Sequence, residues 1–347
     1  MSGHAVAGGH LAGKPAPAGD YDADILILSL DRVAETEAAI QSVLGQTGLS
    51  RHLIVFDQGS SEATLARLRA VIEPHENAQL TSAGGNLGVA EGRNRAAALG
   101  HGRMLIALDN DAVFADSSTA ARAVALLDEQ PQLAALGFRI MNGDGSDEDH
   151  ASWGYPEALR PRAADRFASA TFVGAGHAIR RATWDAVGGY DSALFFTWEE
   201  YDFALRAIDQ GWQLLHAGDI AVHHKLASEG RLDWSGRRWF LFIRNRLYIA
   251  RKWRTPLPAL LARAAAYCLK SMRLGLTRQA WLAVTASFQM PLSVPPRRMS
   301  AGGRAYLGVN DTAWRGGFWF RFRAEVATGL PSTRQRQMRN TPVTTPP

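Results

Sequence analysis

The sequence predicts an α/β fold with a mostly parallel central sheet and a basic, helical C-terminal extension. Over about the first 115 residues, short apolar segments alternate with segments that have the apolar spacing of amphipathic helices, which is the pattern of a parallel sheet covered on both faces. After about residue 237 the chain changes to arginine-rich helical sequence with interleaved aromatic residues. This change predicts the extension.

The sheet prediction depends on three apolar segments and on the helical segments beside them. We expect strands over 24–30, 52–56 and 104–108, and helices over 35–46, 63–73 and 91–99. Parallel sheets bind ligands at the carboxyl ends of their strands, so the residues that follow each strand are candidates for a site. The Gly- and Asp-rich stretch 142–150 is expected to be a mobile loop.

Composition divides the chain of 347 residues into three parts. Residues 1–22 are rich in Gly, Ala, Pro and His, and we expect a disordered leader there, because such a segment buries too little apolar surface to fold. Residues 23–236 should form the sheet domain, in two halves that meet near residue 115. Residues 237–347 form the basic C-terminal region.

The chain has one cysteine, Cys268, and its first residues lack the apolar core of a secretory signal peptide. An internal disulfide is therefore excluded, and we expect a cytoplasmic protein. The uncharged stretch 279–296 contains Gln, Thr, Ser and Pro, so we expect no transmembrane helix.

Charge is distributed very unevenly along the chain. Residues 231–347 hold 21 Lys and Arg against 3 Asp and Glu, a net charge of +18, whereas residues 1–230 hold 17 against 30, a net charge of −13. A basic end of this size implies an anionic partner, and nucleic acid or an anionic membrane surface both fit. The acidic first two-thirds argues against a specific nucleic-acid role.

Asp109, Asn110 and Asp111 follow directly on the third predicted strand. Two carboxylates at the carboxyl end of a buried strand suit Mg²⁺ or Mn²⁺, and such an ion neutralises a diphosphate. Asp and Asn are also common turn residues, so the triplet alone does not decide between a metal site and a turn.

Five further segments carry glycines, acids or histidines in a specific pattern, and they occur in this order: DQGS at 57–60, NLGVAEGRN at 86–94, FVGAG at 172–176, FFTWEEYDFALR at 195–206 and DIAVHH at 219–224. Together with the 109–111 triplet, their order resembles that of family 2 glycosyltransferases over about residues 23–253, and most closely the rhamnosyltransferase-like branch. The resemblance implies a GT-A fold, the Rossmann-like fold of nucleotide-diphospho-sugar transferases, with a nucleotide-binding half over 23–115 and an acceptor half over 116–236.

The resemblance also implies a set of residues that bind the nucleotide-sugar. Asp57 would accept a hydrogen bond from the base, with Gln58 standing in place of the family's usual Asn. Arg93 would reach the diphosphate or organise the carboxylates. Gly174 would let the sugar pack against backbone. The full set implied at the nucleotide-sugar site is Leu30, Asp57, Gly88, Arg93, Asn94, Asp109, Asn110 and Gly174.

In the segment 195–206 the family's second acid is the catalytic base, and here it is Glu200 in place of the usual Asp. Glu serves equally if its carboxylate reaches the acceptor hydroxyl. Glu199 remains an alternative base, and Asp202 completes the implied catalytic group. The same acids are also typical of a helix start, and Asp202 can pair with Arg206 four residues later.

The segment 219–224 ends in His223 and His224. The resemblance implies that one histidine completes a metal site with Asp111 and Asp109. The two imidazoles of a strand point to opposite faces, so one of them is the ligand, and His224 aligns best. The implied cofactor is Mn²⁺ or Mg²⁺.

The resemblance therefore implies an inverting hexosyl- or deoxyhexosyltransferase with Glu200 as base. It would move sugar from a UDP- or dTDP-linked donor to a glycan or lipid-linked acceptor in polysaccharide biosynthesis. The basic region 237–347, with Trp239 to Trp253 and Trp314 to Arg323, would lie on an anionic membrane surface, the inner face of the cell membrane.

Two alternatives stay open at this point. One is a non-catalytic protein that binds a nucleotide-sugar or an anionic surface. The other is a nucleotidyltransferase, which needs a glycine-rich phosphate loop after the first strand, where this chain has Ser29 to Arg32 without glycine.

Overall fold

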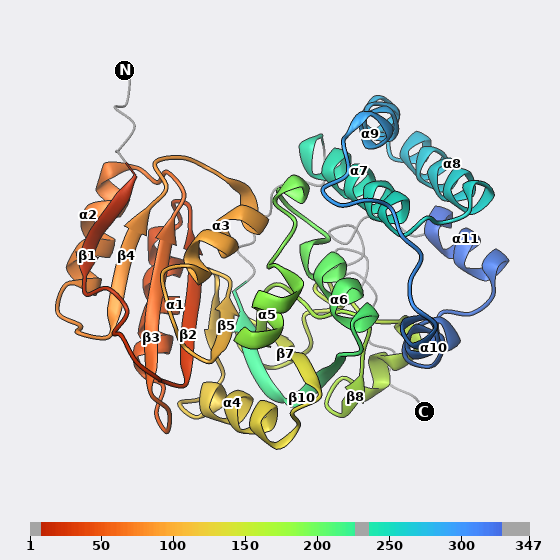
Figure 1. Cartoon of the computed structure of the whole chain (residues 1–347). Helices are drawn as coiled ribbons and strands as arrows, with labels where there is room; N and C mark the ends of the chain where they lie inside the picture. Colours follow the sequence, from red (N-terminus) through yellow and green to blue (C-terminus); the bar gives the residue numbers. More distant parts are fainter. Residues whose placement is uncertain (1–7, 226–235, 328–347) are drawn as a thin grey trace, which may run out of the picture.

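A mixed ten-stranded sheet lies at the centre of the computed structural model, which describes residues 8–225 and 236–327 (Figure 1). The strands are β1 (Gly9–Gly13), β2 (Ala23–Ser29), β3 (Arg51–Asp57), β4 (Ala78–Ser82), β5 (Met104–Leu108), β6 (Ala112–Phe114), β7 (Leu133–Asn142), β8 (Arg166–Ala168), β9 (Gly176–Arg180) and β10 (Gln213–His224). Their spatial order is β1-β4-β3-β2-β5-β9-β7-β10-β6, with β8 paired to β10.

Six of these strands run in one direction. β4, β3, β2 and β5 form a parallel block, β7 and β10 form a second, and β9 runs antiparallel between β5 and β7. The predicted α/β class with a mostly parallel sheet is confirmed. Because β9 joins the two blocks, a single sheet crosses the expected boundary near residue 115.

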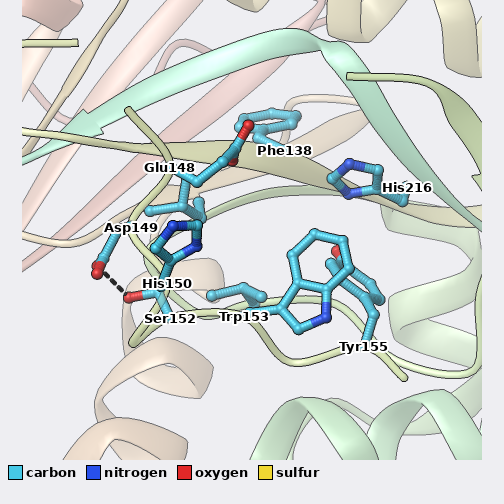
Figure 2. Close-up of a pocket in the computed structure, with 10 residues that line it drawn as sticks. Phe138, Glu148, Asp149, His150, Ser152, Trp153, Tyr155 and His216 are labelled. Carbon is cyan, nitrogen blue, oxygen red and sulfur yellow. Dashed lines mark hydrogen bonds between the residues drawn. The ribbon is translucent and has the colours of Figure 1, made fainter. Parts of the chain in front are cut away.

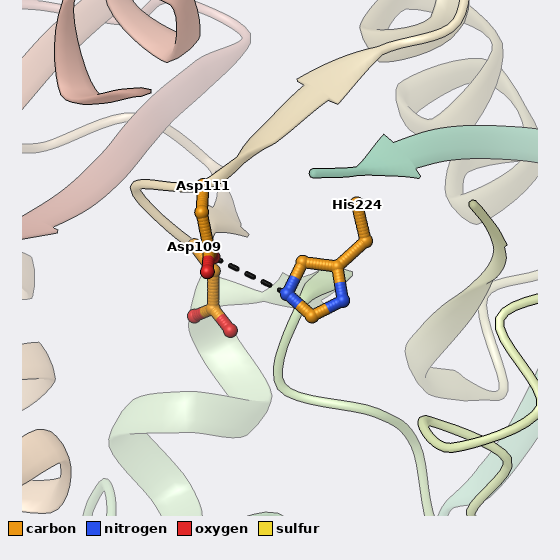
Figure 3. A group of neighbouring side chains, drawn as sticks. All are labelled: Asp109, Asp111 and His224. Atoms are coloured by element: carbon orange, nitrogen blue, oxygen red, sulfur yellow. Dashed lines mark hydrogen bonds and ion pairs between the residues drawn. The ribbon is translucent and has the colours of Figure 1, made fainter. Parts of the chain in front are cut away.

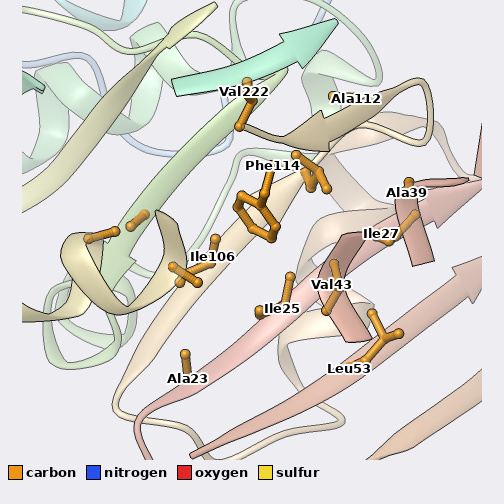
Figure 4. Packing of buried hydrophobic residues seen from close by; sticks show 14 of the residues in the cluster. Ala23, Ile25, Ile27, Ala39, Val43, Leu53, Ile106, Ala112, Phe114 and Val222 are labelled. Carbon is orange, nitrogen blue, oxygen red and sulfur yellow. The ribbon is translucent and has the colours of Figure 1, made fainter. Parts of the chain in front are cut away.

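Helices cover both faces of the sheet. The α-helices are α1 (Val33–Leu44), α2 (Glu62–Ile72), α3 (Gly88–Ala97), α4 (Thr119–Glu129), α5 (Arg181–Val187), α6 (Glu199–Asp209), α7 (Arg237–Lys252), α8 (Leu257–Arg273), α9 (Thr277–Gln289), α10 (Ala301–Asn310) and α11 (Phe318–Ala327), and the short 3₁₀ helices are η1 (Glu157–Arg162), η2 (Ser192–Leu194) and η3 (Thr312–Trp314). One core joins the sheet to α1, α2 and α4 (Figure 4), and a second joins its other face to α3, α5 and α6.

The strands of the parallel block follow from their apolar sequence. β2 and β5 are almost entirely buried because helices cover both of their faces, and the three predicted strands are confirmed to within one residue. β4 was not predicted, since its sequence AQLTS contains three polar residues. Its Gln79 is buried between strand and helix, where its amide donates to the carbonyl of Leu99.

The expected disordered leader over residues 1–22 is wrong for the part that the structure describes. Residues 9–13 form β1, which pairs antiparallel with β4 at the edge of the sheet. Backbone hydrogen bonds to β4 and the burial of Ala12 compensate for the low apolar content of this segment. Residues 1–7 of the leader lie outside the described residues.

The C-terminal helices α7, α8, α9 and α11 form a lobe beside the sheet domain, whereas α10 packs against α6 (Figure 1). Trp239 of α7 and Tyr267 of α8 belong to a core that α7, α8 and α9 share, and Tyr248 of α7 packs against Leu194 and Leu205 of the sheet domain. None of the helices in the described part of the chain is long and apolar enough to cross a bilayer. Residues 328–347 of the predicted extension lie outside the described residues.

Candidate functional site

Asp109, Asp111 and His224 lie together at one edge of the sheet (Figure 3). The two acids follow β5, and His224 ends β10, where it pairs with Ala112 of β6. One ligand atom from each of the three lies within 4.8 Å of the others. The next residue back along β10, His223, points to the opposite face, against Gly145. The alternation of the strand thus puts His224, and not His223, beside the two carboxylates.

Hydrogen bonds hold this group in place. Asp111 Oδ1 lies 3.2 Å from His224 Nε2, and Asp111 Oδ2 accepts from Arg32 Nη1 at 2.6 Å. Although burial opposes the change, His224 and Arg32 lower the pKa of Asp111. Burial also opposes an increase in the pKa of His224, but hydrogen bonds to Asp111 and Asp149 raise this pKa to about 10. Asp111 is therefore ionised at neutral pH, as a metal ligand must be.

Asp149 was missed by the sequence reasoning, which expected a mobile loop over 142–150. Its Oδ2 lies 2.9 Å from His224 Nδ1 and accepts from Ser152 Oγ at 2.5 Å, and it is only 3% exposed. A carboxylate on the second nitrogen of a histidine fixes the ring orientation. No sequence pattern marked Asp149, since its position depends on how the loop folds back against β10.

The same loop borders a small cavity (Figure 2), which is lined by Phe138, Ile140, Glu148, Asp149, His150, Ser152, Trp153, Tyr155, Val173 and His216. It has room for about one water molecule. The cavity is too small for a sugar.

Arg93 is buried and Asn94 is half-buried, and both bond other parts of the protein. Arg93 is 2% exposed and donates to the carbonyls of Leu26 and Leu108 and to Asp109 Oδ1, the last at 3.0 Å. Arg93 was expected either to reach the diphosphate or to organise the carboxylates, and these contacts fit the second role. The Asn94 side chain bonds both backbone groups of Tyr190, at 2.9 Å each, and so joins α3 to the segment before α6.

Other residues expected at the nucleotide-sugar lie around the ends of β2, β3 and β5. Asp57 is fully buried and accepts from the amides of Gly59 and Ser60, so its carboxylate stabilises the turn. Leu30 is 39% exposed. The Asn110 amide donates to Thr36 Oγ1 at 3.1 Å. Leu30 therefore lies at the surface, whereas the polar groups of Asp57 and Asn110 form hydrogen bonds within the protein.

Gly88 and Gly174 are needed for close packing against the segment that carries the acids. Gly88 has φ +82°, and a Cβ there would overlap Phe195. A Cβ at Gly174 would overlap Glu200 Oε1. The expectation that Gly174 faces a sugar therefore changes: its missing side chain makes room for the Glu200 carboxylate.

Glu199 and Glu200 begin α6 but have different surroundings. Glu199 is 3% exposed, and burial first, then the charge of Glu200, raises its pKa well above the ordinary value. Glu200 is half-buried. Burial and the charge of Asp109 raise its pKa to about 7, against the opposing effects of a backbone hydrogen bond and Arg93. The protonated form of Glu199 is thus favoured, whereas Glu200 changes its charge near pH 7.

The turn before Glu199 is strained, and α7 holds it. Phe195, Thr197 and Trp198 all have φ between +63° and +72°, which is rare for residues other than glycine. Asn245 of α7 is fully buried, and its Nδ2 lies 2.8–2.9 Å from the carbonyl oxygens of Leu194, Phe196 and Thr197. A helix of the C-terminal lobe therefore determines the conformation from which the two acids project.

Asp202, expected in the catalytic group, is fully buried within α6. Its Oδ2 accepts from Arg206 at 2.8 Å, as predicted from their spacing, and its Oδ1 pairs with Lys252 of α7 at 2.8 Å. Lys252 also pairs with Asp191 at 2.8 Å. One oxygen of Asp202 is thus used within α6 and the other joins α6 to α7, so these contacts support a structural role, and the catalytic role of Asp202 stays a prediction.

Residues 24–187 match a family model described as glycosyl transferase family 2. A search of curated protein sequences found no match. Similar solved structures include a mannosyltransferase, PcManGT, from Pyrobaculum calidifontis in complex with GDP-Man and Mn²⁺, with a TM-score of 0.55 and 16% identity over 95% of this chain and 90% of that one.

Two further structures share the fold. GalNAc-T7 with UDP, GalNAc and Mn²⁺ has a TM-score of 0.56 and 15% identity over 78% of this chain and 54% of that one. Residues 1–349 of S. aureus TarS have a TM-score of 0.53 and 14% identity over 93% of each chain. At these identities the likeness establishes the fold, which is the expected GT-A fold. The family model matches just under half of this chain, residues 24–187, and the likeness to solved structures shows that the protein has the GT-A fold.

Proposed function

We propose that this protein is an inverting, metal-dependent glycosyltransferase with Glu200 as its general base. In this proposal it moves a sugar, a hexose or deoxyhexose, from a UDP- or dTDP-linked donor to a hydroxyl of a glycan or lipid-linked acceptor in polysaccharide biosynthesis. One observation supports it most strongly. Glu200 titrates near neutral pH and lies close enough to the Asp109, Asp111 and His224 group for the charge of Asp109 to raise its pKa.

Asp109, Asp111 and His224 would hold the metal. Two carboxylates and an imidazole suit Mn²⁺ or Mg²⁺, and Arg32 and Asp149 already orient two of the three side chains. PcManGT and GalNAc-T7, which share the fold, are complexed with Mn²⁺. A metal ion bound here would neutralise the diphosphate of the leaving nucleotide.

Glu200 would take the proton from the acceptor hydroxyl as that oxygen attacks the anomeric carbon. A base acts best when its pKa lies near the working pH, and the pKa of Glu200 is about 7. Burial and the charge of Glu200 raise the pKa of Glu199 well above its ordinary value, which favours its protonated form and makes it the weaker candidate for the base. A single displacement on the face opposite the leaving group inverts the anomeric configuration, and no covalent enzyme intermediate forms.

Nucleotide binding and turnover test the two parts of this proposal separately. Thermal unfolding with UDP, dTDP or GDP, each with Mn²⁺ or Mg²⁺, identifies the nucleotide, because a ligand that binds the native state raises the Tm. We expect a rise with one nucleotide only when metal is present. No rise with any of the pairs contradicts the proposal. A non-catalytic binding protein would show the rise but no release of nucleoside diphosphate from the matching sugar donor.

We also propose that the lobe lies on the inner face of the cell membrane. The sequence predicts that aromatic residues of α7 contact the membrane, but Trp239 and Tyr248 are buried in protein cores and cannot do so. Exposed apolar side chains gather instead on the helices around α7. We call them the outer apolar set: Leu257, Leu261 and Met272 of α8, Trp281 and Phe288 of α9, and Phe318, Trp319 and Phe320 of α11, each 42–70% exposed.

The outer apolar set is accompanied by basic charge, since residues 231–347 carry a net charge of +18. Apolar side chains among Arg residues are typical of surfaces that bind anionic lipid. Flotation with vesicles of phosphatidylglycerol and phosphatidylcholine should recover the protein, and pure phosphatidylcholine should recover less. Replacing Trp281 and Trp319 by Ser should reduce recovery, whereas Val294→Ser, in the linker after α9, should not. Equal failure with both vesicles would remove the membrane part of the proposal.

A further inference from the structure

Two arginines of the lobe face each other next to the helix that carries Glu200. α7 and α8 pack side by side (Figure 1). Trp239 of α7 lies 6.1 Å from Tyr267 of α8, ring to ring, and Phe242 lies 6.0 Å from the same ring. Lys270, one turn further along α8, lies over Trp239. The helices are thus antiparallel, and the next turn of α7 places Arg246 opposite Arg263, one turn back along α8.

Arg246 also contacts the first turn of α6. Its guanidinium lies 4.6 Å from the ring centroid of Tyr201 and 5.1 Å from that of Trp198, and its Nη2 lies 3.3 Å from Tyr201 Oη. Tyr201 is the residue after Glu200. The arginine pair therefore adjoins the proposed base, on the side of α6 that faces the lobe.

The two arginines have different surroundings. Burial opposes the change, but Tyr201, Tyr267 and Asp311 raise the pKa of Arg246. The charge of Arg246, with burial and Arg321 of α11 adding to it, lowers the pKa of Arg263 to about 10. Within residues 236–327, the acids are Asp311 and Glu325, which pair with Arg315 and Lys270. Neither Arg246 nor Arg263 forms an ion pair with a carboxylate of the described residues. Both are half-buried, so each loses part of its hydration without gaining a carboxylate partner.

Two arginines that converge without a carboxylate are the usual means of binding phosphate, because their forked donors match its oxygens. We propose that Arg246 and Arg263, with the Tyr201 hydroxyl, bind a phosphate or diphosphate group of the acceptor. This inference rests on the proposed transferase function and adds a chemical class to its acceptor. The site is separate from the Asp109 group, where the donor diphosphate would bind. Arg321 links it to α11, whose exposed aromatic residues would contact the apolar part of such an acceptor.

Calorimetric titration of metal-free protein with inorganic pyrophosphate in EDTA tests the site. We expect Arg246→Gln and Arg263→Gln each to weaken binding at least tenfold. Arg278→Gln, on the exposed side of α9, is the matched control and should bind like the unmodified protein. Equal pyrophosphate affinity in all four proteins, or no binding by the unmodified protein, would overturn the proposal.

Thermal unfolding without ligand separates this role from a purely structural one. If the pair exists to bind an anion, then removing Arg263 relieves its repulsion by Arg246, and Arg263→Gln should not have a lower Tm. A Tm lowered by several degrees in Arg263→Gln would mean that this arginine serves the packing of the lobe, and the proposal would fail.

Binding of farnesyl diphosphate, a short lipid diphosphate, distinguishes a lipid-linked acceptor from a soluble one. If the unmodified protein binds farnesyl diphosphate more tightly than pyrophosphate, and both glutamine variants lose this binding, the acceptor is lipid-linked. If the two ligands bind equally, the acceptor is a soluble phosphorylated molecule. The nucleotide and metal that raise the Tm of the unmodified protein should raise the Tm of every variant by the same amount. If none of UDP, dTDP and GDP raises the Tm of the unmodified protein with either metal, it is the transferase function that fails, and not the anion site alone.

Discussion

Strands β2, β3, β4 and β5 pair with one another within an 86-residue stretch, residues 23–108, and their apolar side chains fill two continuous cores. The turn before Glu199 is different. Its carbonyls are bound by Asn245, which lies 48–51 residues later in the chain. The first region depends on local sequence and burial, whereas the second depends on one polar side chain from a separate lobe. Substitutions should therefore affect donor binding and acceptor activation independently.

The largest expected effect comes from Glu200→Gln, which removes the proposed base and leaves the strands intact. Turnover should fall by about 10²–10⁴-fold, the usual contribution of a general base. The Tm rise caused by nucleotide and Mn²⁺ should stay within a degree of that in the unmodified protein. Steady-state kinetics and thermal unfolding measure both. Loss of turnover in Glu199→Gln but not in Glu200→Gln would reverse the assignment of the base.

Asn245→Ala tests whether the lobe controls the acids from a distance. The substitution leaves buried carbonyls of a strained turn without a donor, which should cost about 1–3 kcal/mol of stability. We expect kcat to fall at least about tenfold with little change in KM for the donor, because the Asp109 group is untouched. Asn310→Ala, at the end of α10, is the control. If KM for the donor rises and kcat does not fall, the two regions are not independent.

Asp149→Asn should act on the metal and not on the base. It removes a charged acceptor from His224 Nδ1, and a change of this kind typically weakens metal binding by about 10–100-fold. The Mn²⁺ concentration that gives half-maximal turnover should rise accordingly, while turnover at saturating Mn²⁺ should change little. An unchanged Mn²⁺ requirement would mean that His224 is not a ligand.

The smallest expected effect is a pH-dependent change in stability at Glu200. Its pKa is 4.5 in the unfolded chain and about 7 in the folded protein, so the folded state disfavours the charged carboxylate. The cost is absent below pH 4.5, grows between pH 4.5 and 7, and is complete above that. Glu200→Gln should therefore gain about 1–3 kcal/mol at pH 8 and nothing at pH 4. Denaturant unfolding at both pH values measures this. A gain that is larger at pH 4 contradicts the direction of the shift.

The same contrast explains which features could be predicted from the sequence. The three strands predicted from apolar segments agree with the structure to within one residue, since apolar periodicity reports burial directly. The triplet Asp109 to Asp111 was found because it follows such a strand. Asn245 and Asp149 were not found, because their partners are distant in sequence and no local pattern marks a polar residue that binds a remote carbonyl or histidine.

For Arg93, Asn94 and Asp202, the sequence located the residue but did not predict its contacts. A motif gave their positions in the chain, but their contacts with backbone carbonyls, with Tyr190 and with Lys252 depend on packing. Each is buried or joined to a neighbouring element, so it supports the site from within the protein. A motif therefore locates the region of a site better than it assigns the role of each side chain.

Strand β1 has a consequence for how the folded molecule behaves in solution. Without residues 9–13, β4 would be the outermost strand, and the backbone groups that now bond β1 would be open to other chains. An uncovered strand edge is a template for intermolecular pairing and aggregation. Ala12 is the one fully buried residue of β1, so the strand adds few apolar contacts, yet by this argument it shields the sheet from self-association. Its removal should therefore lower solubility far more than it lowers the Tm.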